Sequence, residues 1–291
     1  MKVSYYPGCS LEVTANAYDL STHRVCKDLG MELQEVPEWV CCGASPALKM
    51  SRLLSVSLSA QNLVLIASQG IQDTVAPCPF CYRRLRGAQA EIEADSALKA
   101  QVEEVIEAKV EGNLHIYSLL EYVRAHVGLD AIRAKVTRPL TGLKVIPYYG
   151  CYLVRPPKVV QFDDPENPTS LDEVMEALGA EVIDWDFKAE CCGAALSLNK
   201  TEKVVELSGR LIREAEQLGA DAVVVACPLC LANLDIRQPD VNAQDQLNHH
   251  LPILYFTQAM GLSFGHRPED LGLHTHLVDP LPVLKSKGLA S

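Results

Sequence analysis

Ten of the eleven cysteines in this 291-residue chain fall into two sets that share one order and nearly one spacing. The first set is spaced C-x31-CC-x35-C-x2-C, and the second is spaced C-x39-CC-x34-C-x2-C. Cysteine thiolates bind zinc, hold iron–sulfur clusters and take part in redox chemistry. Each half of the chain is therefore predicted to contain a metal or redox centre. The first cysteine set consists of Cys9, Cys41, Cys42, Cys78 and Cys81, and the second consists of Cys151, Cys191, Cys192, Cys227 and Cys230.

Each set includes two adjacent cysteines followed by glycine, within VPEWVCCGAS at 36–45 and DFKAECCGAA at 186–195. Neighbouring side chains after a strand point in different directions, so two adjacent thiols hold different metal atoms more readily than they chelate one. A structural zinc ion takes four ligands and leaves one thiol of each set unused. The pattern favours a polynuclear iron–sulfur cluster that is larger or less regular than a cubane, which also takes four cysteines. Gly43 and Gly193 are expected to bind the cofactor by allowing the backbone to approach it.

The C-P-x-C segments at 78–81 and 227–230 have a second interpretation. At a strand-to-helix turn they also match a thioredoxin-type dithiol, in which a helix N-terminus lowers the pKa of the thiol. Taken alone, each segment fits this interpretation as well as it fits metal binding. Within two repeated sets of five cysteines, metal binding is favoured. Pro79 and Pro228 stand where proline favours the start of a helix.

The elements that must position these cysteines are repeated as well, because the second half of the chain matches the first half in the same order. Four pairs of segments match: KVSYYPGC at 2–9 with KVIPYYGC at 144–151, WVCCGASPAL at 39–48 with AECCGAALSL at 189–198, VAPCPFC at 75–81 with VACPLC at 225–230, and LHIYSLLEYV at 114–123 with LPILYFTQAM at 251–260. The chain is therefore predicted to be an internal duplication. The polar segment FDDPENPTS at 162–170 is an insertion in the second copy.

Short apolar runs alternate with longer amphipathic stretches in each copy, which predicts alternating strands and helices. Strands are expected at 2–8, 31–36, 74–77, 144–150, 180–185 and 221–226, and helices at about 14–29, 51–69, 170–179 and 201–218 and after each C-P-x-C. Ser170 is the expected cap of its helix and Gly179 the expected end. This alternation implies parallel sheets with right-handed crossovers. We expect an α/β protein of two similar Rossmann-like domains, at 1–140 and 141–291, related by a pseudo-twofold axis and joined near residues 137–141.

The predicted strands place each cysteine set at one edge of a sheet. In each copy the five thiols follow the first, second and third strands. Binding sites of open α/β sheets form in the crevice outside the carboxyl ends of the strands. We therefore expect the five thiols of each copy to converge on one crevice.

The composition is that of an ordered globular protein, with 48% hydrophobic and 22% charged residues, and a chain of this length buries a full core without disulfide bonds. The segment MKVSYYPGCS at 1–10 lacks the apolar core of a signal peptide, and the sequence has no run of about 18 apolar residues. We therefore expect a cytoplasmic protein without membrane insertion, in which disulfide bonds are rare. The net charge of −11 argues against a nucleic-acid partner. Cys26, which has no counterpart in the second copy, is expected to be a small buried hydrophobic residue.

Several basic residues and histidines lie near the cysteines or in polar segments. The basic residues would suit an anionic ligand, but solvent exposure is the favoured interpretation for both groups. The basic residues are Arg83, Arg84, Arg86, Arg155 and Lys158, and the histidines are His249, His250, His274 and His276. No histidine is assigned a role in proton transfer or metal binding.

The doubled cysteine pattern, with both CCG signatures intact, resembles the cysteine-rich CCG-domain proteins. Among them it is most similar to the catalytic B subunits of soluble CoB–CoM heterodisulfide reductases of methanogenic archaea, from Lys2 to about Met260. The resemblance implies two noncubane [4Fe-4S] clusters, each held by one cysteine set, so that the ten cysteines act through the clusters. It also implies an oxidoreductase whose substrate is the mixed disulfide of coenzyme M and coenzyme B, cleaved between the clusters. Because cleavage of a disulfide takes two electrons, two clusters would explain the duplication.

An external electron donor is expected, because the chain has no C-x2-C-x2-C-x3-C-P ferredoxin run. The resemblance implies a ferredoxin-like C subunit with two cubane clusters. It also implies a flavin-containing A subunit linked to a hydrogenase or formate dehydrogenase module.

Two other functions are compatible with the sequence. One is a CCG-domain electron-transfer subunit of another complex, as in thiol-dependent fumarate reductases, membrane-linked succinate dehydrogenases or lactate and glycolate oxidases. Fumarate and sugar-acid members often carry fused ferredoxin domains or one degraded motif, and this sequence has neither. The other is a zinc scaffold without redox chemistry, which metal analysis distinguishes from an iron–sulfur protein.

Overall fold

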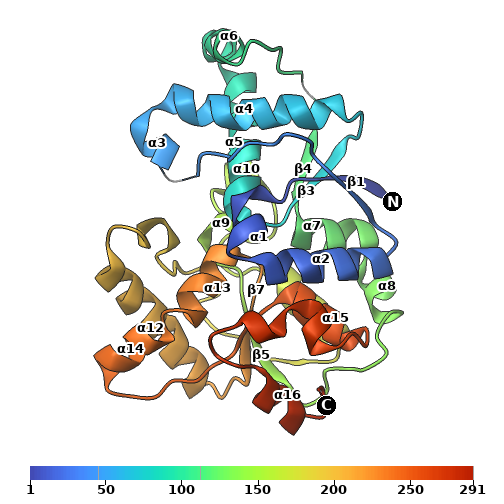
Figure 1. Ribbon diagram of the computed structural model, residues 1–291, viewed down its shortest axis with the longest axis vertical. Helices are drawn as coiled ribbons and strands as arrows, with labels where there is room; N and C mark the ends of the chain where they lie inside the picture. Colours follow the sequence, from blue (N-terminus) through green and yellow to red (C-terminus); the bar gives the residue numbers. More distant parts are fainter. Residues whose placement is uncertain (45, 112, 291) are drawn as a thin grey trace.

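Two four-stranded parallel sheets organise the chain (Figure 1), in a computed structural model that describes residues 1–44, 46–111 and 113–290. The strand order is β2-β1-β3-β4 in the first sheet and β6-β5-β7-β8 in the second. The strands of the first sheet are β1 (Lys2–Tyr5), β2 (Glu32–Glu35), β3 (Asp73–Ala76) and β4 (His115–Ser118). Those of the second are β5 (Lys144–Tyr148), β6 (Glu181–Val182), β7 (Ala222–Val225) and β8 (Ile253–Tyr255). The predicted α/β class with two similar Rossmann-like parallel sheets is confirmed.

The central strands of both sheets are buried. Every residue of β7 is buried, and in β1 only Lys2 is exposed. Tyr5 of β1 is level with Glu35 of β2 and with Val75 of β3, so the three strands end at one edge. Burial on both faces explains why these strands read as continuous apolar runs instead of alternating ones.

Helices cover both sheets. In the first half they are α1 (Gly8–Val13), α2 (Asn16–Asp28), α3 (Pro46–Met50), α4 (Arg52–Ser68), α5 (Pro79–Ala94), α6 (Ser96–Val105), α7 (Leu119–Tyr122), the π-helix η1 (Val123–Val127) and α8 (Leu129–Arg133). In the second half they are α9 (Cys151–Val154), α10 (Pro157–Val160), α11 (Ser170–Ala177), η2 (Ala194–Leu196), α12 (Thr201–Gln217), α13 (Pro228–Asp235), α14 (Gln238–Asp245), α15 (Phe256–Ser263), η3 (Pro268–Leu271), η4 (Leu273–Thr275) and α16 (Leu281–Ser286).

The two long helices that follow the CCG segments are where the sequence predicts them. The predicted helix 51–69 is α4, for which the Ser51 hydroxyl accepts a hydrogen bond from the backbone N–H of Leu54. The predicted helix 201–218 is α12. Pro79 and Pro228 are the first residues of α5 and α13, as expected.

The helix expected at about 14–29 is α2, which begins at Asn16 because a separate short helix, α1, starts at Gly8 and ends before it. Two other local predictions are wrong. Ser170 does not cap α11; the Asp163 carboxylate accepts the N–H groups of Thr169 and Ser170 instead. The strand expected at 180–185 pairs only over Glu181–Val182.

Two further predictions, the end of α11 and the match between residues 114–123 and 251–260, agree with the structure. Gly179 ends α11 as expected, with a positive φ of 84° that glycine adopts without strain. The matching segments at 114–123 and 251–260 are each a strand followed by a helix, namely β4 with α7 and β8 with α15. These fourth strands extend both sheets beyond the three strands that the sequence predicts.

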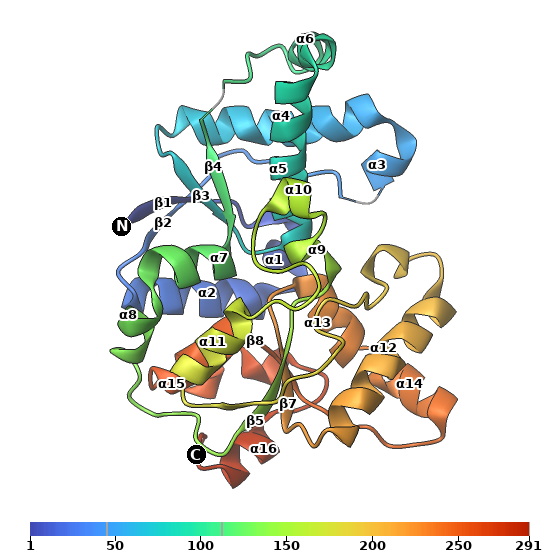
Figure 2. The same cartoon turned by 180° about the vertical axis from the view of Figure 1, so that it is seen from behind.

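Helices from the two halves pack against each other across the centre of the molecule. Helix α2 lies against α15, α1 against α13, and α5 against α9 and α10, and Figure 2 shows α9 and α10 next to α5.

Residues 137–141 lie between α8 and β5, and the N–H of Thr137 donates to the Ser263 carbonyl. We propose this segment as the boundary between a domain at 1–140 and a domain at 141–291. In the described part of the chain, no helix combines the length and apolar character that crossing a bilayer requires.

Candidate metal centres

Both cysteine sets lie at the carboxyl ends of their sheets, at the switch point of the strand order. In the order β2-β1-β3-β4, the chain leaves β1 toward one side and β3 toward the other, which opens a crevice between their ends. Cys9 follows β1, and Cys78 and Cys81 follow β3. In the second half, β5 and β7 place the equivalent cysteines in the same way, namely Cys151, Cys227 and Cys230.

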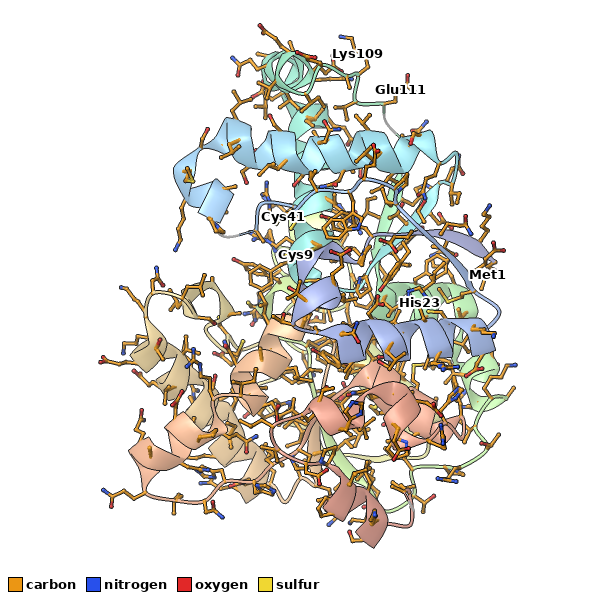
Figure 3. All side chains as sticks on the ribbon, in the orientation of Figure 1. Met1, Cys9, His23, Cys41, Lys109 and Glu111 are labelled. Carbon is orange, nitrogen blue, oxygen red and sulfur yellow. The ribbon has the colours of Figure 1, made fainter. Side chains whose placement is uncertain are left out.

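The sulfurs of the first set form two close pairs. Cys9 Sγ lies 4.0 Å from Cys41 Sγ, and these two side chains face each other at the exposed side of the site (Figure 3). Cys42 Sγ lies 3.5 Å from Cys81 Sγ in the interior. Cys78 is also buried.

The second set has the same two pairs. Cys151 Sγ lies 3.9 Å from Cys191 Sγ, and Cys192 Sγ lies 3.6 Å from Cys230 Sγ. We call the pairs with Cys9 and Cys151 the outer pairs and those with Cys42 and Cys192 the inner pairs. In each half, the two adjacent cysteines therefore have different sulfur partners.

The donor set fits a polynuclear thiolate-bound metal centre. Two thiolates on one tetrahedral metal at 2.3 Å lie about 3.8 Å apart, which is close to all four sulfur–sulfur distances, from 3.5 to 4.0 Å. A disulfide bond is near 2.04 Å, and all eleven cysteines are free thiols. Among the described residues, no three His, Cys, Asp or Glu side chains enclose a position for a single ion. Pairs on neighbouring metal atoms match this arrangement better than one mononuclear site.

Backbone N–H groups at helix starts face several of the thiols. Cys78 is the N-cap of α5, and the N–H of Gly193 donates to Cys191 Sγ at 3.3 Å. Cys151 and then the Gly193 N–H lower the pKa of the Cys191 thiol to about 6. The pKa of the Cys41 thiol is also lowered, by Cys42, by Cys9 and by the Gly43 N–H. Cys41 and Cys191 therefore favour the thiolate, the form that binds metals.

The partners of these thiolates have raised pKa values. The hydrogen bond to Cys41 raises the pKa of Cys9, and the hydrogen bond to Cys191 raises that of Cys151. In each outer pair, the first cysteine of the set therefore keeps its proton while its partner is ionised.

Glycines make room for the inner pairs. A Cβ at Gly8 would lie 2.7 Å from Cys81 Sγ, and a Cβ at Gly150 would lie 2.9 Å from Cys230 Sγ. At Gly43 and Gly193 the nearest atoms to an added Cβ belong to other elements, at Leu58 of α4 and Leu207 of α12. A role of Gly43 and Gly193 in cofactor binding thus stays a prediction, as does the assignment of the ten cysteines as ligands.

Two buried tyrosines support the CCG segments, and sequence reasoning missed both. The hydroxyl of Tyr6 donates to the carbonyl of Val40 at 2.6 Å, and that of Tyr148 donates to the carbonyl of Glu190 at 2.8 Å. These carbonyls belong to the residues directly before Cys41 and Cys191. Burial and then the surrounding cysteines raise the pKa values of both phenols. The signal was in the sequence, because both tyrosines stand three residues before the first cysteine of their set.

The basic residues differ in their surroundings. Lys158 is exposed as expected. Arg84 is not solvated: it is 7% exposed, and the solvated interpretation is wrong for it because the side chain lies under α4 and donates to the Ser55 carbonyl at 2.8 Å. Arg83, Arg86 and Arg155 are half-buried, over Tyr152, beside Glu121 and beside Glu166 respectively.

The histidines also divide into two groups. His250 and His274 are exposed, as expected. His249 is buried, and the expectation of exposure is wrong because its ring bonds the carboxylates of Glu216 and Asp245. His276 is half-buried against Gln258 of α15. Cys26 is buried, as predicted.

One tyrosine bridges the two sites. The hydroxyl of Tyr18 in α2 lies 3.1 Å from the Ala226 carbonyl and 3.4 Å from the Pro77 carbonyl. These carbonyls directly precede Cys227 and Cys78, one in each half. The ring of Tyr18 stacks on Tyr255 with centroids 4.2 Å apart. A single buried side chain thus connects the two cysteine-bearing turns.

Comparison with known proteins finds relatives among the subunits of reductases. The chain is 32% identical over 95% of its length to the 8-methylmenaquinol:fumarate reductase membrane anchor subunit of Wolinella succinogenes, and the match covers 96% of that protein. It is 28% identical over 97% of its length to the B subunit of the ferredoxin/F(420)H(2)-dependent CoB-CoM heterodisulfide reductase of Methanosarcina acetivorans, covering 96% of it.

A solved structure has the same fold, and a family model covers the cysteine-bearing segments. The structure is a hypothetical protein from Helicobacter pylori, with a TM-score of 0.76 and 14% identity over 96% of this chain and 52% of that one, so this chain spans about half of its length. The cysteine-rich CCG domain model matches residues 3–86 and 145–235. The chain therefore belongs to the CCG cysteine-rich domain family, with one copy of the domain in each half.

Proposed function

We propose that this chain is the iron–sulfur subunit of a reductase complex and that it reduces the heterodisulfide CoM-S-S-CoB to coenzyme M and coenzyme B thiols. The two sets of five cysteines, paired alike at the switch points of two sheets, carry this proposal. Relatives that are named as subunits of reductases support a redox role for the chain. Each set would hold one noncubane [4Fe-4S] cluster, and a bound cluster supplies single electrons.

The overall reaction needs two electrons and two protons, because CoM-S-S-CoB becomes two thiols when its sulfur–sulfur bond breaks. Two one-electron centres on one chain match this requirement. The outer pairs are the part of each site that a substrate would reach, since Cys9, Cys41 and Cys191 are exposed whereas the inner pairs are buried. The chain's own contribution is to supply ten cysteine sulfurs, to direct backbone N–H groups at some of them and to keep the inner pairs buried.

Exposed apolar side chains near the CCG segments support docking of an electron-donating partner. Met50, at the end of α3, is 77% exposed, and Leu198, just after η2, is 98% exposed. Each follows a CCG segment by only a few residues. Burying these side chains would favour the docking of another subunit beside the exposed thiols. The ferredoxin-like C subunit and the flavin-containing A subunit, with a hydrogenase or formate dehydrogenase module, are the partners that we propose.

A second candidate is an electron-transfer subunit of a quinol:fumarate reductase complex. The 32% identity to the Wolinella succinogenes subunit over nearly the whole of both chains favours it. In this role the same two centres would pass electrons between a quinol and a fumarate-reducing partner. The architecture of the sites suits both candidates, so the substrate decides between them.

The first experiment is metal analysis of the anaerobically purified chain. We expect about eight iron and about eight acid-labile sulfide per chain, as two four-iron clusters require. The double variant Cys191→Ser/Cys192→Ser should keep about half of both, and Cys26→Ser, which alters a buried cysteine outside the sets, should keep all. Two zinc ions without sulfide would contradict the proposal and support a zinc scaffold.

The second experiment identifies the substrate. The iron-loaded chain with its partner subunits is assayed for reduction of CoM-S-S-CoB and, separately, for quinol-dependent reduction of fumarate. We expect heterodisulfide reduction that Cys41→Ser and Cys191→Ser each abolish, together with a thiol-dependent paramagnetic species after coenzyme M is added under oxidising conditions. Fumarate reduction alone would assign the second candidate.

A further inference from the structure

The two cysteine sets differ at one equivalent position. In α5, Arg84 stands three residues after Cys81, and in α13, Asn233 stands three residues after Cys230. Both side chains therefore lie about one helical turn beyond the last cysteine of their set. The duplication has placed a cation at one site and a neutral amide at the other.

The guanidinium of Arg84 is buried without a carboxylate partner. The residue is 7% exposed, and its Nη2 donates to the Ser55 carbonyl at 2.8 Å. Its Nε has no hydrogen-bond partner among the described residues. No carboxylate in residues 1–44, 46–111 and 113–290 forms an ion pair with Arg84 at 4.0 Å or less, although Arg52 and Arg86 nearby both have one. A buried charge in this state is unfavourable unless an anion lies nearby.

The two groups whose negative charge acts most on Arg84 are Cys42 of the inner pair and, to a lesser extent, Glu91. Cys81 is one turn before Arg84, and its sulfur is 3.5 Å from that of Cys42. Burial lowers the pKa of Arg84, and negative charge on Cys42 acts in the opposite direction. Metal binding would ionise the inner pair, and negative charge on Cys42 is within electrostatic reach of the guanidinium.

The second site lacks such a cation at the equivalent position. Asn233 Nδ2 donates to the Cys192 carbonyl at 3.0 Å and lies 3.6 Å from Cys192 Sγ, so its amide takes the position next to the inner pair. Negative charge on Glu190 acts on Cys191 from the adjacent residue.

Carboxylates neutralise the buried and half-buried basic groups near the second site. Lys188 bonds Asp172 and Asp184, and Arg155 bonds Glu166. Arg210, which stacks on Phe187, is exposed to solvent. The second set therefore has no buried cation at the position equivalent to Arg84.

We propose that Arg84 makes the cluster of the first cysteine set easier to reduce than the cluster of the second set, so that the two centres are not equivalent. The inference rests on the proposed function, because it assumes that each set holds an iron–sulfur cluster. Reduction adds one electron to a cluster, and a nearby buried cation stabilises that added charge. The first centre is then the one that takes an electron first from a partner or a chemical reductant.

The test is a potentiometric titration with dithionite, followed by electron paramagnetic resonance, on chains that keep one set. Cys191→Ser/Cys192→Ser leaves the first centre, and Cys41→Ser/Cys42→Ser leaves the second. At one fixed potential, the ratio of reduced to oxidised cluster should be at least about tenfold higher for the first centre, which corresponds to ~59 mV for one electron. Equal ratios would overturn the inference.

Substitutions at Arg84 assign the difference to its charge. In the chain that keeps the first set, Arg84→Asn should lower the ratio about tenfold, whereas Arg84→Lys, which keeps a positive charge, should leave it within about threefold. A purely structural role would change the unfolding temperature in both variants without separating their potentials. If Arg84→Asn does not fold, Asn233→Arg in the other chain should raise the ratio of the second centre, and an unchanged ratio there counts against the inference.

The two proposals fail in different ways. A chain without iron and acid-labile sulfide disproves the proposed function before any titration is made. A chain with both clusters and two identical potentials, unaffected by Arg84→Asn, keeps the proposed function and disproves only the role of Arg84.

Discussion

At the scale of single residues, each site depends on glycines that leave room for sulfur as well as on the cysteines themselves. Gly8 and Gly150 precede the first cysteines of the two sets, with φ of 70° and 66°. Both combine a left-handed backbone with close approach to an inner-pair sulfur. These two demands leave glycine as the residue that fits.

Substitutions at Gly8 and at a control glycine distinguish the effect of the positive φ from the effect of crowding the Cys81 sulfur. Gly8→Ala should destabilise the fold by about 1–2 kcal/mol through the positive φ and also displace the Cys81 sulfur, which lies 2.7 Å from the new Cβ. Gly30→Ala is the matched control, because Gly30 has a φ of 72° but nothing within 4 Å of an added Cβ. We expect both variants to lose stability in denaturant unfolding and only Gly8→Ala to lose iron. Equal iron contents would show that the sulfur tolerates the Cβ.

At the scale of elements, the segment that follows η4 packs against helices α13 and α15 of the second half. The carboxylate of Asp235 in α13 accepts the N–H groups of Leu277 and Val278. His276, just before them, contacts Gln258 of α15 through Nε2, and its Nδ1 has no partner among the described residues. The segment after η4 is thereby held against both helices.

The docking of this segment should depend on pH. Burial, and to a lesser extent His274, lowers the pKa of His276 from 6.5 to about 4. Because the unfolded chain binds the proton more readily, this residue's contribution to stability is complete above pH 6.5 and is lost as the pH falls toward 4. Each pH unit in that window removes up to about 1.4 kcal/mol.

A comparison of wild type with His276→Gln isolates this effect. The free energy of unfolding is measured in denaturant at about pH 7 and about pH 5 for both chains, on either side of the ordinary histidine pKa. Wild type should lose more stability than the variant between the two pH values. Parallel losses would mean that other groups cause the acid sensitivity.

At the scale of the whole molecule, the two sites are connected by contacts across the interface between the halves. Helices α1, α5, α9 and α13, which carry cysteines of both sets, pack across it. Buried polar contacts between α2 and α15 include Ser21 Oγ and Thr257 Oγ1 at 2.7 Å. Tyr18 holds the turns that lead into Cys78 and Cys227.

Removal of the Tyr18 hydroxyl should weaken this coupling. Tyr18→Phe keeps the ring that stacks on Tyr255 but leaves two buried carbonyls without their donor, at a cost of about 1–3 kcal/mol. Tyr6→Phe, the control, removes a tyrosine hydrogen bond to a backbone carbonyl within the first half alone. Calorimetry should show a less cooperative transition for Tyr18→Phe than for Tyr6→Phe. Unchanged cooperativity in both would mean that the halves are coupled through other contacts.

The sequence predicted the sheet class, the duplication and the long helices α4 and α12 because these follow from local periodicity and from repeated motifs. It missed β4 and β8, whose short apolar runs lead directly into helices. It misplaced the cap of α11, because the carboxylate that caps this helix comes from Asp163 in the inserted loop. It also misjudged Arg84 and His249, since a polar side chain is buried only where other segments supply its partners.

By itself, the sequence determined that ten cysteines recur in two sets at equivalent places of a duplicated chain, because their order and spacing can be read from the residues alone. Only the tertiary structure decided that Cys41 pairs with Cys9 and Cys42 with Cys81, since these pairs depend on how three strand ends meet. The same is true of the difference between Arg84 and Asn233. Burial turns a change from arginine to asparagine into a change of electrostatic potential, and burial arises from packing between segments that are distant in the sequence.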